Sequence, residues 1–228
     1  MVLIYSLIFA AVLSLVFTSS IKKHYWFYYS LSGLVAISTT IYEILRLTSN
    51  MKLYGFISIL EKASIKGIIS ISFFVLVMFA GALQTKWAIT RKLLRIRAEL
   101  AIIASILLLP HGFIYLIRFI IKAMNGSLSV IYLSYIIIGT IGFIIMIPLF
   151  ITSFKKIRLK MKGHQWKKLQ RWAYLFYLLA YLHILIILVD KEKIDWLKLI
   201  TYTIIFGGYA ILRFLKSKNT RQAQVVSL

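Results

Sequence analysis

The feature that constrains this chain most is a series of apolar runs, each close to the length that crosses a bilayer. About 20 apolar residues match the hydrocarbon thickness of a membrane, and such runs are too long for ordinary soluble core strands or helices. The chain has 228 residues, of which 61% are hydrophobic, and only six are Asp or Glu. A soluble domain is about half apolar. The sequence therefore predicts one integral membrane domain with no soluble domain attached.

We expect an all-α, polytopic bundle of about seven transmembrane helices. The predicted spans cover residues 2–20, 25–45, 66–85, 99–121, 130–152, 172–189 and 197–215. The first span lacks the basic start and the Ala-x-Ala-like site of a signal peptide, so we expect it to be retained within an N-terminal pair of helices, 1–45. Residues 46–65 are only mildly apolar and carry charges, which favours an interfacial segment. Residues 216–228 are expected to form a cytoplasmic tail.

Positive charge is concentrated on one side of the predicted bundle. The segments 21–24, 86–98, 153–171 and 213–228 hold 19 of the 28 Lys and Arg residues, and five of the six acids lie on the other side. The positive-inside rule then predicts a plasma-membrane protein with an outer N-terminus and a cytoplasmic C-terminus. This topology and attraction to anionic lipids account for the net charge of +22, so no nucleic-acid partner is expected. The basic block 155–171 could also dock an acidic cytosolic partner.

Two histidines stand out as ionisable residues deep inside the predicted bundle. His111 lies 14 residues after Arg97, and His183 lies 12 residues after Arg171, on spans that run in the same direction. At about 1.5 Å per residue, both side chains lie at nearly the same depth, in the outer half of the membrane. Two imidazoles at one depth can bind a single b-type haem from its two faces, inside a helix bundle.

Other roles remain open for this pair, because each histidine could instead hydrogen-bond to a neighbouring helix and stabilise packing. Zinc or copper is disfavoured, since the chain has no Cys and we expect no other buried ionisable group, with Glu43 and Glu99 at span ends. His24 and His164 are expected at the cytoplasmic surface. Arg118 is a candidate partner for haem propionates, or it extends to the lipid headgroups.

The segment that ends at His183 carries a recognisable pattern. It consists of Thr152-Ser153, a basic loop, Gly163-His164-Gln165-Trp166, Leu169-Gln170-Arg171 and Tyr174-Leu175. In this pattern the chain resembles the ferric reductase-like transmembrane domain family, and in particular the haem-bearing membrane subunit of the bacterial methionine sulfoxide reductase system. A weaker similarity covers the basic loop at Arg91 and the helix of His111. The resemblance spans about residues 66–215 and implies a six-helix core, to which this chain adds one N-terminal helix.

The resemblance implies that His111 and His183 are axial haem ligands on the outer side. At the position of Gln170 the family usually has a histidine that serves the inner half of the membrane, and Gln is a poor iron ligand. Gln170 precedes His183 by 13 residues, which is about 20 Å of helix, so the two positions cannot share one iron. One haem is therefore expected. Two would require another inner ligand such as His24 or His164, and a flavin or quinone could fill the gap on that side.

These features together predict the membrane haem subunit of an oxidoreductase. Its donor would be a cytosolic flavin reductase or membrane quinol, and its acceptor a partner protein or ferric iron on the outer face. No Gly-rich turn between a strand and a helix is found, so a nicotinamide would bind to another chain. The alternative is a cofactor-less scaffold or assembly factor of the same family, for which Gln170 is the evidence. A transporter is disfavoured, because we expect no coupling acids inside the membrane.

Overall fold

Helices account for nearly all of the chain in the computed structural model, which describes residues 2–49, 52–190 and 193–226, with side chains up to residue 219. No strand occurs among these residues. The helices are α1 (Val2–Val16), α2 (Thr18–Lys23), α3 (Tyr25–Ser49), α4 (Gly55–Ile65), α5 (Ile68–Ala82), α6 (Ala88–Arg95), α7 (Arg97–Met124), α8 (Val130–Ile151), α9 (Lys155–Arg158), α10 (Gly163–Gln170), α11 (Trp172–Val189) and α12 (Trp196–Val226). The predicted all-α class is confirmed.

Four stretches of helix are long and apolar enough to cross a membrane. They are α7, α8, residues 163–189 formed by α10 and α11, and α12 up to Asn219. A fifth span results if α4 and α5 are taken together, although they meet at an angle of 56°. The described residues thus contain four to five candidate spans. They support an integral membrane protein, but the predicted count of about seven is not confirmed.

The helices of the first two predicted spans, α1 and α3, explain this difference in count. α1 ends at Val16 and has 15 residues, so it is about 22 Å long, against a hydrocarbon core of about 30 Å. α3 has 25 residues, but serines, threonines, tyrosines and Glu43 interrupt its apolar sequence. α1 packs on α5, and α3 packs on α7. Both predicted spans are therefore helices of the bundle that do not qualify as spans by length and composition.

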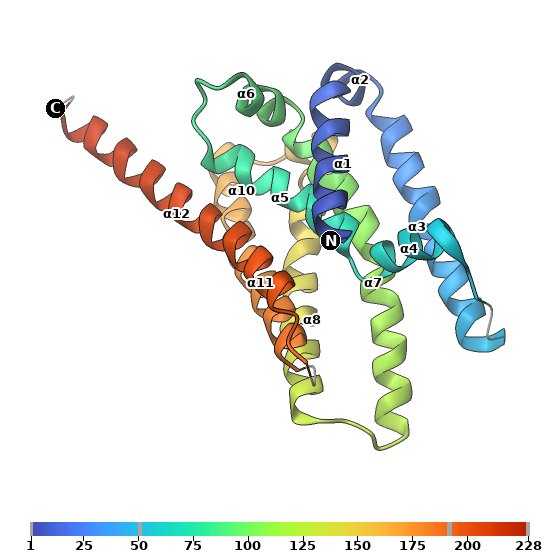
Figure 1. Ribbon diagram of the computed structural model, residues 1–228. Helices are drawn as coiled ribbons and strands as arrows, with labels where there is room; N and C mark the ends of the chain where they lie inside the picture. The colour runs from blue at the N-terminus through green and yellow to red at the C-terminus, as the bar shows by residue number, and fades with distance from the viewer. Residues whose placement is uncertain (1, 50–51, 191–192, 227–228) are drawn as a thin grey trace.

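The centre of the bundle is formed by α5 and α7. α5 packs against both α1 and α7, and α8 packs along α11 and lies between α11 and α7 in Figure 1. Most side chains of α5 are buried, including Phe73 and Met78, and they belong to one apolar core with Ile102 and Ile103 of α7. α7 packs mainly on α3 and α5, and α8 packs mainly on α11. α7 and α8 touch each other only slightly. The separation of α7 from α8 leaves room between them.

The short basic helices gather at one end of the bundle. α2 and α6 lie together at the top of Figure 1 and are in contact. There Lys22 forms an ion pair with Glu99 at the start of α7, at 2.6 Å. α12 continues without a break past the expected span end at residue 215, as far as Val226. The first part of the predicted tail is therefore helical, and residues 227–228 lie outside the described residues. The cytoplasmic assignment of this end stays a prediction.

The predicted interfacial segment, residues 46–65, includes the end of α3 and all of α4. α4 contacts α3, α5 and α7, and its last turn is buried. It ends at Ile65, and α5 begins only after Gly67, whose φ of +70° is a left-handed conformation that favours glycine. The result is a broken helix whose break lies inside the bundle. The interfacial role of the segment stays a prediction.

Candidate functional site

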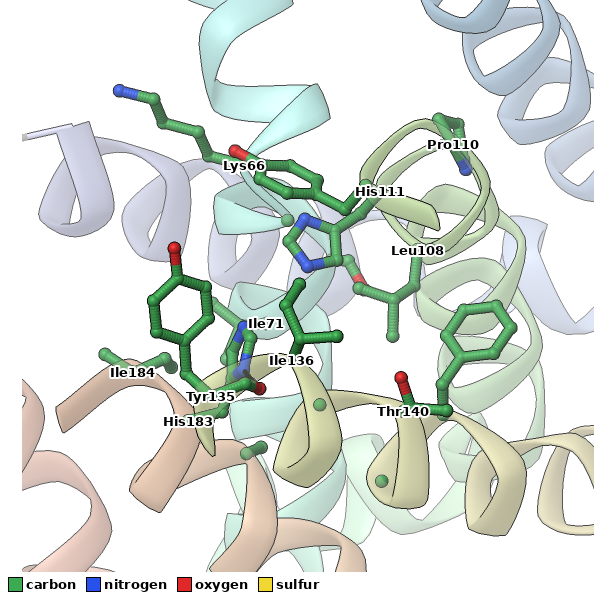
Figure 2. Close-up of a pocket in the computed structure, with 18 of the residues that line it drawn as sticks. Lys66, Ile71, Leu108, Pro110, His111, Tyr135, Ile136, Thr140, His183 and Ile184 are labelled. Carbon is green, nitrogen blue, oxygen red and sulfur yellow. Dashed lines mark hydrogen bonds between the residues drawn. The ribbon is translucent and has the colours of Figure 1, made fainter. Parts of the chain in front are cut away.

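A large cavity lies between α7 and α8, and residues of α3, α5, α11 and α12 complete its wall. Its volume is about 1290 Å³, above the ~300–1,000 Å³ of most small-molecule sites. Most of the side chains around it are apolar. The polar residues at its wall are Thr40, Lys66, Ser70, His111, Tyr115, Tyr135, Thr140, His183, Lys198 and Tyr202. Figure 2 shows a close-up of this cavity.

His111 of α7 and His183 of α11 face each other across the cavity (Figure 2). Their ring centroids are 6.0 Å apart, and the ring planes are nearly perpendicular, at 88°. Two imidazoles that bind one metal ion from opposite sides, with bonds of about 2 Å, have centroids roughly 6 Å apart. The structure thus brings together the two histidines that the sequence places at one depth. Their separation is that of a pair of axial ligands.

The hydrogen bonds of the two rings fix which nitrogen is available. His111 Nδ1 lies 2.9 Å from the backbone oxygen of Ile65, and His183 Nδ1 lies 2.8 Å from that of Tyr135. A carbonyl oxygen can only accept a hydrogen bond, so Nδ1 carries the proton in both rings. In the neutral imidazole Nε2 then keeps its lone pair. This is the arrangement of metal-binding histidines, whose second nitrogen donates to a backbone carbonyl.

Gly139 on α8 lets His183 reach its backbone partner. It lies one helical turn after Tyr135, and a Cβ at Gly139 would be 2.8 Å from two atoms of the His183 ring. Any larger residue would therefore collide with the imidazole. Gly112 has a similar relation to Phe143, because a Cβ there would be 2.5 Å from the Phe143 ring. Gly112 thus allows the Phe143 ring of α8 to pack against α7.

The break between α4 and α5 provides the partner of His111. Because α4 ends at Ile65, the carbonyl of that residue is free to accept from the imidazole. Gly67 lies against the same ring, and a Cβ there would be 3.7 Å from His111 Nδ1 and 3.2 Å from Leu108. The helix break was not predicted from the sequence. A lone glycine after Lys66, at the start of an apolar run, does not reveal it.

Arg118 has a protein partner outside the cavity. It forms an ion pair with Glu43 of α3, whose side chain has no exposed surface, and its guanidinium lies 5.0 Å from the Tyr115 ring centroid. Arg46 also pairs with Glu43, at 3.2 Å. The role of Arg118 toward haem propionates stays a prediction, and the structure adds a second role, in joining α7 to α3.

The expectation that no other ionisable group is buried was wrong. Glu43, Glu61 and Glu99 are 0%, 8% and 9% exposed. The absence of buried acids therefore cannot argue against a transporter. Glu43 and Glu99 instead form ion pairs with Arg118 and Lys22, and neither Glu43 nor Glu61 lines the large cavity. The sequence did contain a signal for the ion pair of Glu43 and Arg118. Each residue lies in an apolar run, where a charged side chain needs a partner of opposite charge.

The ion pair of Arg118 gives a first testable expectation. Arg118→Leu leaves the buried Glu43 with Arg46 as its remaining cation, and we expect a loss of roughly 3 kcal/mol, because unpairing a buried charge is costly. Thermal unfolding of the purified protein in detergent measures this loss. Lys122→Leu is the matched control, since Lys122 is exposed one turn further along α7. Equal midpoints for the two variants would contradict the assignment.

A second cavity, of about 500 Å³, lies toward the basic end of the bundle. Gln170 lines it and donates to Thr152 Oγ1 at 3.3 Å, and Arg97 of α7 also lines it. Six of its wall residues are basic, namely Lys22, Arg95, Arg97, Arg158, Lys167 and Arg171. No histidine is among the described residues around this cavity. His24 and His164 are both exposed and lie outside its wall.

Metal-ion sites of other kinds find no ligand set in the described part of the chain. No group of three or more His, Cys, Asp or Glu side chains there is placed to hold a metal ion. His111 and His183 would therefore supply two ligands between them, which suits a haem, whose macrocycle would supply the others.

Comparison with known proteins identifies a recognised domain that includes His111 and ends two residues before His183. Residues 66–181 match the family described as ferric reductase like transmembrane component. An uncharacterized protein of Treponema pallidum (strain Nichols) is 35% identical over 161 residues, which cover 67% of this chain and 44% of that protein. The chain thus spans less than half the length of this relative. No solved structure shows significant similarity to the chain.

Proposed function

This chain belongs to the ferric reductase-like transmembrane component family, and we propose that it is a membrane electron-transfer subunit that binds one b-type haem between His111 and His183. The observation that carries the proposal is the pair of imidazoles 6.0 Å apart, each with Nδ1 bound to a carbonyl. Both open into one large apolar cavity. The link to the methionine sulfoxide reductase system is part of the proposal and rests on the sequence pattern.

The haem supplies an iron that takes up and gives off one electron, and the chain supplies its environment. The carbonyls of Ile65 and Tyr135 hold both rings in the tautomer whose Nε2 can bind iron. Apolar side chains such as Ile71 and Ile184 line the cavity and exclude water, which lowers the local dielectric around a buried charge. Axial ligand identity and burial are the two features through which a protein sets a haem potential.

The second cavity lies toward the predicted cytoplasmic side and is the inner one of the two, and the cavity of His111 and His183 is the outer one. The inner cavity supports a count of one haem per chain. Arg97 and Gln170 line it, at 14 and 13 residues before the two histidines on the same continuous runs of sequence. The inner cavity therefore has Arg and Gln where the outer one has two imidazoles. Neither side chain is a good iron ligand. The same observation favours the scaffold alternative only if the outer pair also fails to bind haem.

Gln170→Ala is expected to leave the haem content unchanged. The side chain hydrogen-bonds to Thr152 and has no contact with the outer cavity, so its removal takes no ligand from the proposed haem. A pyridine haemochrome assay on purified protein measures haem per chain. Values near one for both proteins support the single site. A value near two in the original protein that falls in the variant would place a second haem at the inner cavity.

The position of the cavity favours a membrane quinol as the donor. Its wall includes Ile37 and Ile137, which are 59% and 55% exposed on the outside of the bundle, so the cavity opens toward the lipid phase. The start of α7 lies 14 residues before His111, and the basic end is therefore about 20 Å away. A lipid-soluble donor covers this distance by diffusion. A cytosolic flavin reductase would need a further carrier at the inner cavity.

Electron transfer across proteoliposomes tests the proposed function. Vesicles with a reduced short-chain quinol in the bilayer are mixed with an impermeant ferric chelate outside. We expect ferrous iron to form with the original protein and not with His183→Ala. Replacing the quinol by NADH and a flavin reductase inside the vesicles tests the cytosolic route. Reduction rates equal to those of protein-free vesicles with both donors would overturn the proposal.

A further inference from the structure

Two buried glutamates from different helices are in contact near the candidate haem site. Glu43 of α3 is 0% exposed and Glu61 of α4 is 8% exposed. The two carboxyl groups lie within reach of each other, on helices that are in contact. In each of them one buried oxygen, Oε1, has no N–H or O–H donor among the groups around it. A few residues further along, Thr39 and Ser64 hydrogen-bond at 3.0 Å and hold the two helices together.

Two buried carboxyl groups this close to each other favour a shared proton. An ionised carboxylate can only accept hydrogen bonds, so two ionised carboxylates cannot bond to each other. One shared proton satisfies both and removes one of two like charges from a buried site. We propose that Glu43 and Glu61 form a proton-binding site whose occupancy follows the charge of the neighbouring haem. The inference rests on the proposed function, because it assigns a proton partner to that redox site.

The charged groups around the two carboxyl groups determine whether the pair holds a proton. The groups that face it are Arg46 of α3, Lys62 of α4, and Arg118 and Tyr115 of α7. Arg46 and Arg118 pair with Glu43, and together they offset two ionised carboxylates. A bound proton adds one positive charge, which an electron on the haem stabilises. One electron delivered to the site is then accompanied by one proton taken up between the carboxylates, and its departure by release of that proton to water.

Two short routes connect the pair with His111. Along α4, Glu61 lies one helical turn before Ile65, whose carbonyl accepts from His111 Nδ1. Along α7, the partner of Glu43 is Arg118, which lies 5.0 Å from the Tyr115 ring centroid, and the Tyr115 ring is 4.6 Å from that of His111. Charge at the carboxyl pair therefore acts on the candidate ligand through space and through its hydrogen-bond partner. Neither glutamate touches the imidazole directly.

Redox titration of the purified protein at several pH values tests the inference. We expect the midpoint potential to fall as pH rises, because a scarcer proton disfavours the reduced state, by up to about 59 mV per pH unit for one proton per electron. Glu61→Gln should flatten this slope and keep the haem, since the amide can donate to Glu43 without a titrating proton. Glu99→Gln is the control, because Glu99 pairs with Lys22 at the far end of the bundle. It should keep the slope.

Infrared difference spectra of the same samples provide a second readout. Reduction should produce the carbonyl band of a protonated carboxyl in the original protein and in Glu99→Gln, and not in Glu61→Gln. A haem potential independent of pH in the original protein would overturn the coupling and leave the proposed function intact. An unchanged slope and band in Glu61→Gln would place the proton elsewhere and overturn the assignment. A protein that binds no haem would overturn both proposals.

Discussion

His183→Ala is expected to yield a membrane protein without haem absorbance. The substitution removes one of two proposed axial ligands, and no other described histidine lies close enough to His111 to replace it. Even the loss of a ligand's supporting hydrogen bond commonly costs roughly 10–100-fold in metal affinity, so loss of the ligand itself should exceed this. Haem per chain in detergent-purified protein, measured by the pyridine haemochrome, gives the result. His111→Ala should behave in the same way.

The control for both variants is His164→Ala. His164 is exposed near the start of α10, so its removal should leave haem content and protein yield unchanged. Two imidazoles that serve only helix packing would give another pattern. The original protein would then contain no haem, and His183→Ala would merely lower the thermal midpoint. Full haem retention in His183→Ala would exclude this residue as a ligand.

Gly139→Ala is expected to reduce haem binding nearly as strongly, although glycine offers no ligand. The new Cβ would lie 2.8 Å from the Cε1 and Nδ1 atoms of His183, so the ring must turn away. It then loses its hydrogen bond to Tyr135, and its position relative to His111 changes. We expect haem affinity to fall roughly 10–100-fold. Titration of the haem-free protein with haemin, followed by absorbance, measures this change.

Gly142→Ala is the matched control for this substitution. Gly142 lies three residues further along α8, and a Cβ there would be 3.6 Å from Leu179 Cβ, which is an ordinary contact. Both changes add one methyl group to a glycine of the same helix and differ in what that group meets. Haem affinity should be unchanged in Gly142→Ala. Equal losses in the two variants would show that α8 tolerates no added bulk, and that Gly139 has no special relation to His183.

The pairing of His111 with His183 follows from sequence spacing, because an α-helix has a fixed rise per residue. Equal distances from the basic ends of two parallel spans are enough to place both side chains at one depth. Their separation of 6.0 Å needs the packing of α7 and α11 in addition. The family pattern from Thr152 to His183 lies mostly within the matched region, residues 66–181. It indicated the family, although not which subunit type this chain represents.

The supporting contacts could not be predicted from the sequence, because each joins helices that are far apart in the chain. The carbonyls of Ile65 and Tyr135 are backbone groups that any residue would provide. Gly139 matters only because His183 packs against it. Glu43 and Glu61 were placed at a span end and in an interfacial segment, yet both are buried. Hydropathy describes single helices, whereas burial of a charged residue depends on its partner.

The measurement that tests the central claim most directly is a dithionite-reduced minus air-oxidised visible spectrum of the purified protein, produced with ample haem supply. Two neutral imidazoles across an apolar cavity predict a sharp b-type α-band, with close to one haem per chain by pyridine haemochrome. A colourless protein that is folded and correctly inserted in the membrane would contradict the account. It would leave a scaffold that keeps the family fold without its cofactor.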